Sequence, residues 1–279
     1  MRWRLVNTGL RRGKFNMDFD TYLAHRLLEG EGIPTVRFFG WKPWAISLGF
    51  HQRQDDVNLE KCMNDGIDVV KRPTGGRAIL HAEELTYSVV MYAEGRNVLE
   101  TYEYISRALI AGLQYLGVNA DLAGGSVKFS EMYRSDIAIP CFASTSKFEV
   151  QCGGKKIVGS AQRRYASSYE HAHDVVLQHG SVLLGPHHRA LAEYISPPRS
   201  EMREIIRYTL EQKTTEVETV LGRHVPFDEV ADAMRQGFED AWGIRFAEEH
   251  SSMDDQVLSS SLIQKISHNI HCTQHHGRR

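Results

Sequence analysis

The chain has 279 residues, 42% of them hydrophobic, and a formal net charge of −2. This length suits one large domain with an appendage or two small ones, and the near-neutral charge argues against a general nucleic-acid binder. No apolar run approaches the roughly 20 residues that span a bilayer. The basic N-terminus lacks an apolar signal core and the four cysteines form no CxxC pair. We therefore expect a cytoplasmic protein with reduced thiols and no membrane partner.

The first part of the chain predicts strands and helices in alternation. Residues 3–7, 35–39 and 45–48 are rich in β-branched and aromatic side chains, as strands are. Asn16 is placed to cap a helix over residues 16–29, which Gly30 ends. The patterns further predict helices over residues 58–65 and 98–116, a hairpin of residues 147–150 and 156–160 around Gly153-Gly154, and a strand pair over 175–177 and 181–184.

The pattern becomes helical after residue 185. Residues 188–195, 202–210 and 227–242 carry apolar side chains at helical spacing. We expect an α+β core over residues 1–185 and a smaller helical cap over residues 186–247. Residues 248–279 are polar, Ser-rich and His-rich, a composition typical of a poorly ordered tail.

One stretch in the core attracts attention because its turn is both basic and glycine-rich. Residues 69–91 read VVKRPTGGRAILHAEELTYSVVM, which predicts a strand, a tight loop and a second strand. Gly75 and Gly76 have no Cβ, so the backbone can approach a ligand closely. Their N–H groups, between Arg72 and Arg77, can hold an anionic or carbonyl oxygen. The alternative is that this turn merely closes a hairpin. We name residues 72–77 the glycine loop.

Three further segments share this mixture of apolar and reactive residues. They are IPCFAS at residues 139–144, GKKIVGSAQ at residues 154–162 and QHGS at residues 178–181. Taken alone, a cysteine among apolar residues is usually a small buried hydrophobe, and a strand lysine is usually solvated. With the glycine loop, however, the four blocks resemble, in order, the lipoate/octanoate branch of the biotin/lipoate protein ligase family. The similarity is greatest to its cysteine-dependent octanoyltransferases and covers residues 1–245. Thr145 stands where that family pattern has Pro, and residues 163–173 form a longer connection than usual.

The resemblance implies a mixed, mostly antiparallel sheet flanked by helices, with the acyl chain in a central tunnel. It implies that Cys141 accepts the acyl group and that Lys156 contacts the acyl carbonyl. The residues implied in substrate binding are Arg72, Gly75, Gly76, Arg77, His81, Gly159, Ser160, His179 and Gly180. Both histidines are equally compatible with a purely structural role.

The implied reaction moves an octanoyl group from an acyl-carrier protein to a lysine of a lipoyl domain or a glycine-cleavage H protein. It needs no cofactor, since a carrier thioester is already activated. Two alternatives remain: an ATP-dependent lipoate ligase, and a carrier-domain binding module without catalysis. We assign Cys62 and Cys152 to structural positions. We expect no specific metal site, because clusters in polar tails usually bind metals adventitiously; the tail cluster is His268, His271, Cys272, His275 and His276.

Overall fold

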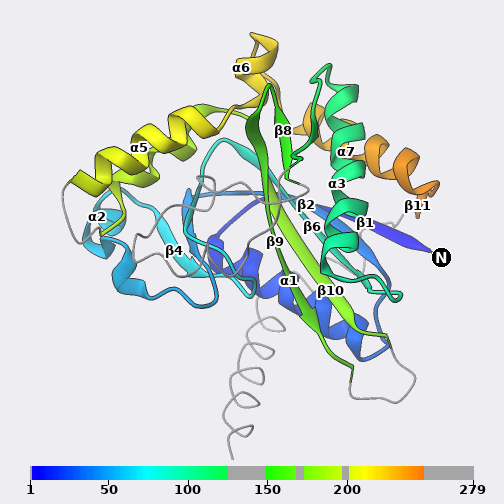
Figure 1. The fold of residues 1–279 in the computed structure, drawn as a ribbon. Helices are drawn as coiled ribbons and strands as arrows, with labels where there is room; N and C mark the ends of the chain where they lie inside the picture. The colour runs from blue at the N-terminus through cyan, green and yellow to red at the C-terminus, as the bar shows by residue number, and fades with distance from the viewer. Residues whose placement is uncertain (1, 125–148, 168–172, 197–200, 248–279) are drawn as a thin grey trace, which may run out of the picture.

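The computed structural model describes residues 2–124, 149–167, 173–196 and 201–247 (Figure 1). Cys141, Thr145 and the His-rich tail lie outside these residues. Within them, the larger sheet has eight strands in the order β11-β1-β2-β6-β10-β9-β8-β7, and β4-β3-β5 form a second sheet. Strand β1 is parallel to β2 and β11, whereas the other neighbours in the larger sheet are antiparallel. The predicted α+β class with a mixed, mostly antiparallel sheet is confirmed.

The bounds of the elements follow the chain order. The strands are β1 (Trp3–Arg11), β2 (Thr35–Trp41), β3 (Ala45–Leu48), β4 (Asp68–Lys71), β5 (Ile79–His81), β6 (Glu84–Tyr92), β7 (Asp121–Leu122), β8 (Val150–Cys152), β9 (Lys155–Tyr165), β10 (Val175–Leu183) and β11 (Phe246–Ala247). The helices are α1 (Gly13–Leu28), α2 (Leu59–Asn64), α3 (Val98–Tyr115), α5 (Glu201–Lys213), α6 (Val217–Leu221) and α7 (Phe227–Trp242), with 3₁₀ turns η1 (Gln54–Asp56) and η3 (Pro186–Glu193).

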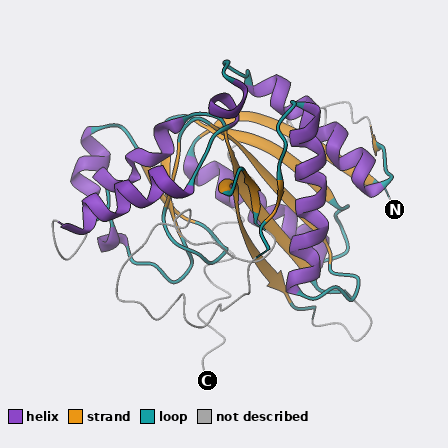
Figure 2. Cartoon of the chain, turned by 45° about the horizontal axis from the view of Figure 1, so that its top comes forward, coloured by secondary structure: helices purple, strands orange, loops and turns teal. Residues whose placement is uncertain are grey.

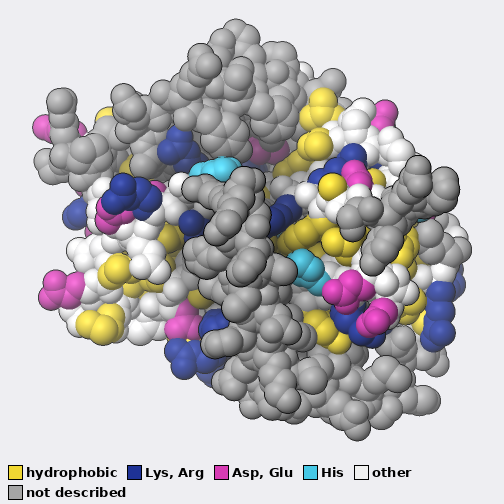
Figure 3. Space-filling view, turned by 90° about the horizontal axis from the view of Figure 1, so that it is seen from below, with side chains coloured by type: hydrophobic (Ala, Val, Ile, Leu, Met, Phe, Trp, Pro, Cys, Tyr) yellow, Lys and Arg dark blue, Asp and Glu magenta, His cyan; other side chains and the backbone are white. Residues whose placement is uncertain are grey.

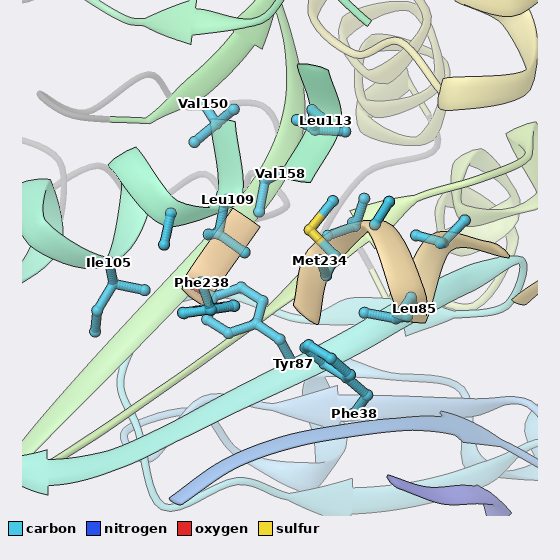
Figure 4. Packing of buried hydrophobic residues seen from close by; sticks show 14 of the residues in the cluster. Phe38, Leu85, Tyr87, Ile105, Leu109, Leu113, Val150, Val158, Met234 and Phe238 are labelled. Atoms are coloured by element: carbon cyan, nitrogen blue, oxygen red, sulfur yellow. The ribbon is translucent and has the colours of Figure 1, made fainter. Parts of the chain in front are cut away.

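Helices cover both faces of the larger sheet (Figure 2). Helices α3 and α7 pack together on one face, where Phe38 and Tyr87 of the sheet meet Leu109, Met234 and Phe238 (Figure 4). The two helices cross at glycines. A Cβ on Gly237 would lie 2.2 Å from the backbone nitrogen of Gly112, so only glycine permits this approach. Helix α1 packs on the opposite face through Phe19, Leu23 and Leu27.

The helices after residue 185 take part in two of the hydrophobic clusters. Helix α7 belongs to the cluster just described. Helix α5 and the turn η3 pack on the second sheet, where Ile206 and Leu191 join Ile46 and Leu80 in one buried cluster. Residues before and after position 186 pack in the same two clusters, so these contacts do not mark a boundary there. The division of the chain at residue 186 stays a prediction.

Two local predictions were wrong, for tertiary reasons. The first helix begins at Gly13, and Asn16 lies inside it instead of capping it. The Asn16 side chain is buried, accepts from Arg37 at 2.7 Å and donates to the carbonyl of Gly40 at 3.0 Å. Residues 175–183 form one strand, not a pair, because Gln178, His179 and Gly180 continue the pairing with both β6 and β9.

The surface carries no single dominant charge in the view from below. Figure 3 shows acidic and basic side chains interspersed among the described residues, in keeping with the net charge of −2. Among the helices that the structure describes, none is both long and apolar enough to cross a membrane.

Candidate active site

A pocket forms where the two sheets meet, and its walls bring together six of the residues predicted to bind substrate. Arg72, His81, Gly159, Ser160, His179 and Gly180 line it together with Met17, Trp41, Ser47, Ile79, Thr86, Ala161 and Ser181. It holds about 310 Å³ of space free of atoms, its open mouth included. Gly75, Gly76 and Arg77 belong to the adjoining glycine loop.

The buried guanidinium of Arg72 holds the glycine loop in place. It donates to the carbonyl and hydroxyl of Ser47 at 2.9 and 3.0 Å, to the carbonyl of Gly75 at 3.1 and 2.8 Å, and to the carbonyl of Arg77 at 2.7 Å. An arginine has five N–H donors, and these bonds occupy all five. The structure thus gives Arg72 the role of fixing the loop backbone, while a direct contact with substrate stays a prediction.

The loop backbone is packed closely from outside as well. The amide of Phe50 donates to the carbonyl of Thr74 at 2.9 Å. A Cβ on Gly49 would lie 1.9 Å from the carbonyl oxygen of Gly76, whose φ of 93° also favours glycine. Within the described part of the chain, the N–H groups of Gly75 and Gly76 donate to no protein acceptor. The loop therefore turns carbonyls toward Arg72 and leaves two amides for another acceptor.

His179 joins the loop to the buried face of the larger sheet. Its Nδ1 lies 3.1 Å from Asp20 Oδ2 and its Nε2 lies 2.7 Å from the hydroxyl of Thr74. Burial lowers the pKa of His179 despite the nearby carboxylate, so the ring is neutral, with Nδ1 donating and Nε2 accepting. Burial alone would raise the pKa of Asp20, but the charge of Arg37 and the hydrogen bonds from His179 and Arg37 hold this pKa below its usual value.

His81 occupies a similar position on the second sheet. Its Nδ1 lies 2.8 Å from Glu84 Oε1 and its Nε2 lies 2.7 Å from the hydroxyl of Ser47. The ring stacks on Trp41 with centroids 4.0 Å apart. Burial would raise the pKa of Glu84, yet the charge and hydrogen bond of His81 and the hydroxyls of Thr86 and Ser181 lower it. The carboxylate is therefore ionised at neutral pH.

A β-bulge in β9 lies beside Lys156, which is not among the described residues that line the pocket. Val150 pairs with Val158 but the next residue pairs with Lys156, so Ile157 is an additional residue in β9. Ile157 and Val158 are both buried in the cluster with Val150, which directs Lys156 to the opposite face. That face carries Gly159, ~10 Å farther along the strand. The Lys156 ammonium donates to Glu149 Oε1 at 2.7 Å and is nearly buried.

Comparison with known proteins places this chain in a family. Residues 12–239 match the family model described as the lipoyl protein ligase A/B catalytic domain. The chain belongs to this family. It is 37% identical to octanoyltransferase LipM of Symbiobacterium thermophilum, with 94% of each chain covered. It is 35% identical to octanoyltransferase LipM of Kyrpidia tusciae, over 94% of this chain and 95% of that one. These relatives identify the chain as an acyltransferase.

A solved structure supports the fold in the same way. The crystal structure of lipoate-protein ligase A bound with ATP superposes with a TM-score of 0.72 at 23% identity, covering 95% of each chain. At this identity the likeness concerns the fold. The expected similarity to the lipoate/octanoate branch of the family is confirmed by the sequence matches.

Several side chains that shape the site escaped the sequence analysis. Glu84 follows His81 by three residues, and that spacing was a signal that could have been used. Asp20 is 159 residues from its partner His179, and Ser47 gave no local signal, so only the folded arrangement of α1 and β3 brings these two side chains to the site. Glu149 is seven residues from Lys156, and the predicted hairpin was a signal that could have been used.

The two described cysteines lack the features of a nucleophile. Burial raises the pKa of both the Cys62 and Cys152 thiols, whereas a reactive cysteine needs a lowered pKa. Among the described residues no group of His, Cys, Asp or Glu side chains is arranged to hold a metal ion. Cys141 lies outside these residues, and its role stays a prediction.

The buried neutral His179 makes the free energy of unfolding depend on pH. Its pKa in the folded state is lower than in the unfolded chain, so as pH falls below about 6.5 the unfolded state binds the proton first. The free energy of unfolding should therefore decrease from pH 7.5 to pH 5.5, by at most about 1.4 kcal/mol per pH unit for each such histidine. His25 and His188, whose pKa values burial also lowers, add to the decrease.

Urea unfolding at three pH values measures this effect, and His179→Gln is the matched variant. It removes one titrating group, so its stability should fall less steeply with decreasing pH than that of the wild type. Equal slopes for the two proteins would contradict the assignment of a depressed pKa to His179.

Proposed function

We propose that this protein transfers an octanoyl group from an acyl-carrier protein, through a thioester on Cys141, to a lysine of a lipoyl domain or a glycine-cleavage H protein, in the cytoplasm. The observation that carries the proposal is the pocket with apolar walls beside a glycine loop whose Gly75 and Gly76 amides donate to no acceptor among the described residues. The names of the relatives and the IPCFAS block around Cys141 support the choice of acyl group and nucleophile.

The first step exchanges one thioester for another. The Cys141 thiolate attacks the carbonyl carbon of the carrier thioester, and the tetrahedral intermediate collapses with release of the carrier thiolate. Both thioesters have similar energy, so no ATP is consumed. The N–H groups of Gly75 and Gly76 are the donors we assign to the oxyanion of this intermediate.

The second step forms the amide that makes the overall reaction favourable. The neutral ε-amine of the acceptor lysine attacks the acyl carbonyl, the Cys141 thiolate leaves, and the amine proton passes to solvent. A free lysine has a pKa near 10.4, so a cationic surrounding favours the neutral amine. We assign this effect, and the lowering of the Cys141 pKa, to Lys156, which Glu149 orients.

The acyl chain itself needs an apolar surface. Met17, Trp41, Ile79 and Ala161 supply it in the pocket. Burying a methylene contributes about 0.8 kcal/mol, so an eight-carbon chain contributes several times more than the polar contacts at one carbonyl.

The main alternative is an ATP-dependent lipoate ligase, since a ligase with bound ATP shares this fold. Such an enzyme needs no cysteine nucleophile, and its reaction starts from a free acid. A binding module without catalysis is the second alternative. The chain's identity to octanoyltransferases along nearly its full length favours transfer over both.

The requirement for ATP separates these three functions. Octanoyl transfer from octanoyl carrier protein to an apo lipoyl domain should proceed without ATP or Mg²⁺, because the thioester is already activated. Mass spectrometry of the acceptor measures the product. Transfer only from free octanoate with ATP would identify a ligase, and the absence of transfer under both conditions would favour the binding module.

A further prediction concerns Lys156. Lys156→Met should lower kcat by about 10²-fold, the size of effect seen when one preorganised electrostatic donor is lost. Lys155→Met is the matched control, because Lys155 is the neighbouring strand lysine and, among the described residues, its amine donates to the carbonyl of Glu211 alone. This variant should retain activity within about twofold.

Removing Lys156 also leaves Glu149 buried without that cation, which lowers stability. The double variant Lys156→Met/Glu149→Gln separates the two effects. It should recover thermal stability while kcat stays low. Full activity in the double variant would remove Lys156 from the site.

A further inference from the structure

The polar side chains of the pocket are not separate groups but members of two hydrogen-bond relays. Each relay begins at a buried carboxylate, passes through a histidine and ends on the glycine loop. The Asp20 relay consists of Asp20, His179 and Thr74. The Glu84 relay consists of Glu84, His81, Ser47 and Arg72.

The Asp20 relay reaches the loop from the larger sheet and α1. Asp20 is completely buried, and Arg37 and Ser88 hold its Oδ1 at 2.8 Å each. Its Oδ2 fixes the His179 ring, whose other nitrogen accepts from Thr74 at 2.7 Å. Thr74 is itself buried and immediately precedes Gly75, so this relay holds the first half of the loop.

The Glu84 relay reaches the same loop from the second sheet. Glu84 accepts from the hydroxyls of Thr86 and Ser181 as well as from His81. Ser47 links His81 to Arg72, and Arg72 then binds the carbonyls of Gly75 and Arg77. This relay therefore holds the second half of the loop.

The two histidines have no ring nitrogen to spare for proton transfer. Both nitrogens of His179 and both of His81 lie within 3.1 Å of a protein oxygen in the described structure. A histidine that acts as general base must be within reach of the substrate proton. In this arrangement the two rings hold the hydroxyls of Thr74 and Ser47 in fixed positions.

Glu84 carries a cost that its local contacts do not explain. Its Oε2 is buried and has no hydrogen-bond partner within the described residues. A buried carboxylate with an unsatisfied oxygen lowers stability, and such groups gather where function requires them. An ionised acceptor makes a stronger hydrogen bond than a neutral one, so the Glu84 carboxylate holds the His81 ring firmly.

We propose that Asp20 and Glu84 are positioning residues for acyl transfer: through His179 and His81 they hold the glycine loop from two sides, so that the amides of Gly75 and Gly76 are fixed for the acyl carbonyl oxygen. The inference rests on the proposed function. It also accounts for a loop in which Gly76 adopts a φ of 93° that favours glycine, a residue that leaves the backbone conformationally free, while two amides must keep a single orientation.

The test removes one hydroxyl from each relay without touching its charges. Thr74→Val cuts the Asp20 relay and Ser47→Ala cuts the Glu84 relay. With octanoyl carrier protein and an apo lipoyl domain, each should lower kcat about 10- to 100-fold and change KM less than twofold, because the lost contact serves the transition state. The double variant should be slower than either single one. Thr74→Ser, which keeps the hydroxyl, should restore the rate to within threefold of the wild type.

Thr101→Val is the control for loss of a buried threonine hydroxyl. Thr101 is completely buried on α3, where its hydroxyl donates to the carbonyl of Asn97. It should leave kcat and KM unchanged even if it lowers the melting temperature as much as Thr74→Val does. Glu84→Gln keeps the size of the side chain and removes its charge, and it should lower kcat about tenfold at unchanged KM.

The outcomes distinguish the two levels of the hypothesis. A wild-type protein that transfers octanoate, with Thr74→Val and Ser47→Ala equally active, would overturn the positioning roles and leave the proposed function intact. Loss of activity that follows only the loss of folded protein, in Thr101→Val as in Thr74→Val, would also overturn them. A wild-type protein with no ATP-independent transfer would overturn the proposed function itself.

Discussion

The buried ion pair between Asp20 and Arg37 is the contact from which the geometry of the site extends. Both side chains are completely excluded from solvent and their charged atoms lie 2.8 Å apart. Two buried charges are costly unless their remaining donors and acceptors are satisfied. Here Thr8 and Asn16 take further guanidinium donors, and the Phe39 ring lies 3.8 Å from the Arg37 Cζ atom. The pair thereby fixes helix α1 against the larger sheet.

From that fixed point the polar contacts run outward to the glycine loop, and the site divides into two kinds of residue. The inner residues, among them His179, His81 and Arg72, bond to one another and set the position of the backbone. The second kind are the residues to which we assign chemistry: Lys156 on the bulged strand β9, and Cys141, which lies outside the described residues. This division explains why the pocket holds so many ionisable groups while the buried His179 stays neutral.

The sequence predicted the parts of this site that are local and missed those that are not. The glycine loop was found from its own basic, glycine-rich pattern, and the blocks around Gly159 and Gly180 were found from their resemblance to a known family. The outcome for Asn16 shows the limit: its residue type favours a helix cap, but a tertiary bond to Arg37 placed it inside the helix. Likewise the sequence analysis predicted two strands separated by residues 178–180, whereas pairing on both sides keeps β10 continuous.

The central claim is that Cys141 carries the acyl group between donor and acceptor. Incubation with octanoyl carrier protein alone, followed by intact-mass analysis, tests it most directly. The account predicts a single octanoyl adduct that hydroxylamine removes and that an apo lipoyl domain discharges onto its own lysine. Cys141→Ala should lose both the adduct and the transfer, and Cys62→Ala and Cys152→Ala should keep both. Transfer by Cys141→Ala at the wild-type rate would contradict a covalent intermediate on this residue.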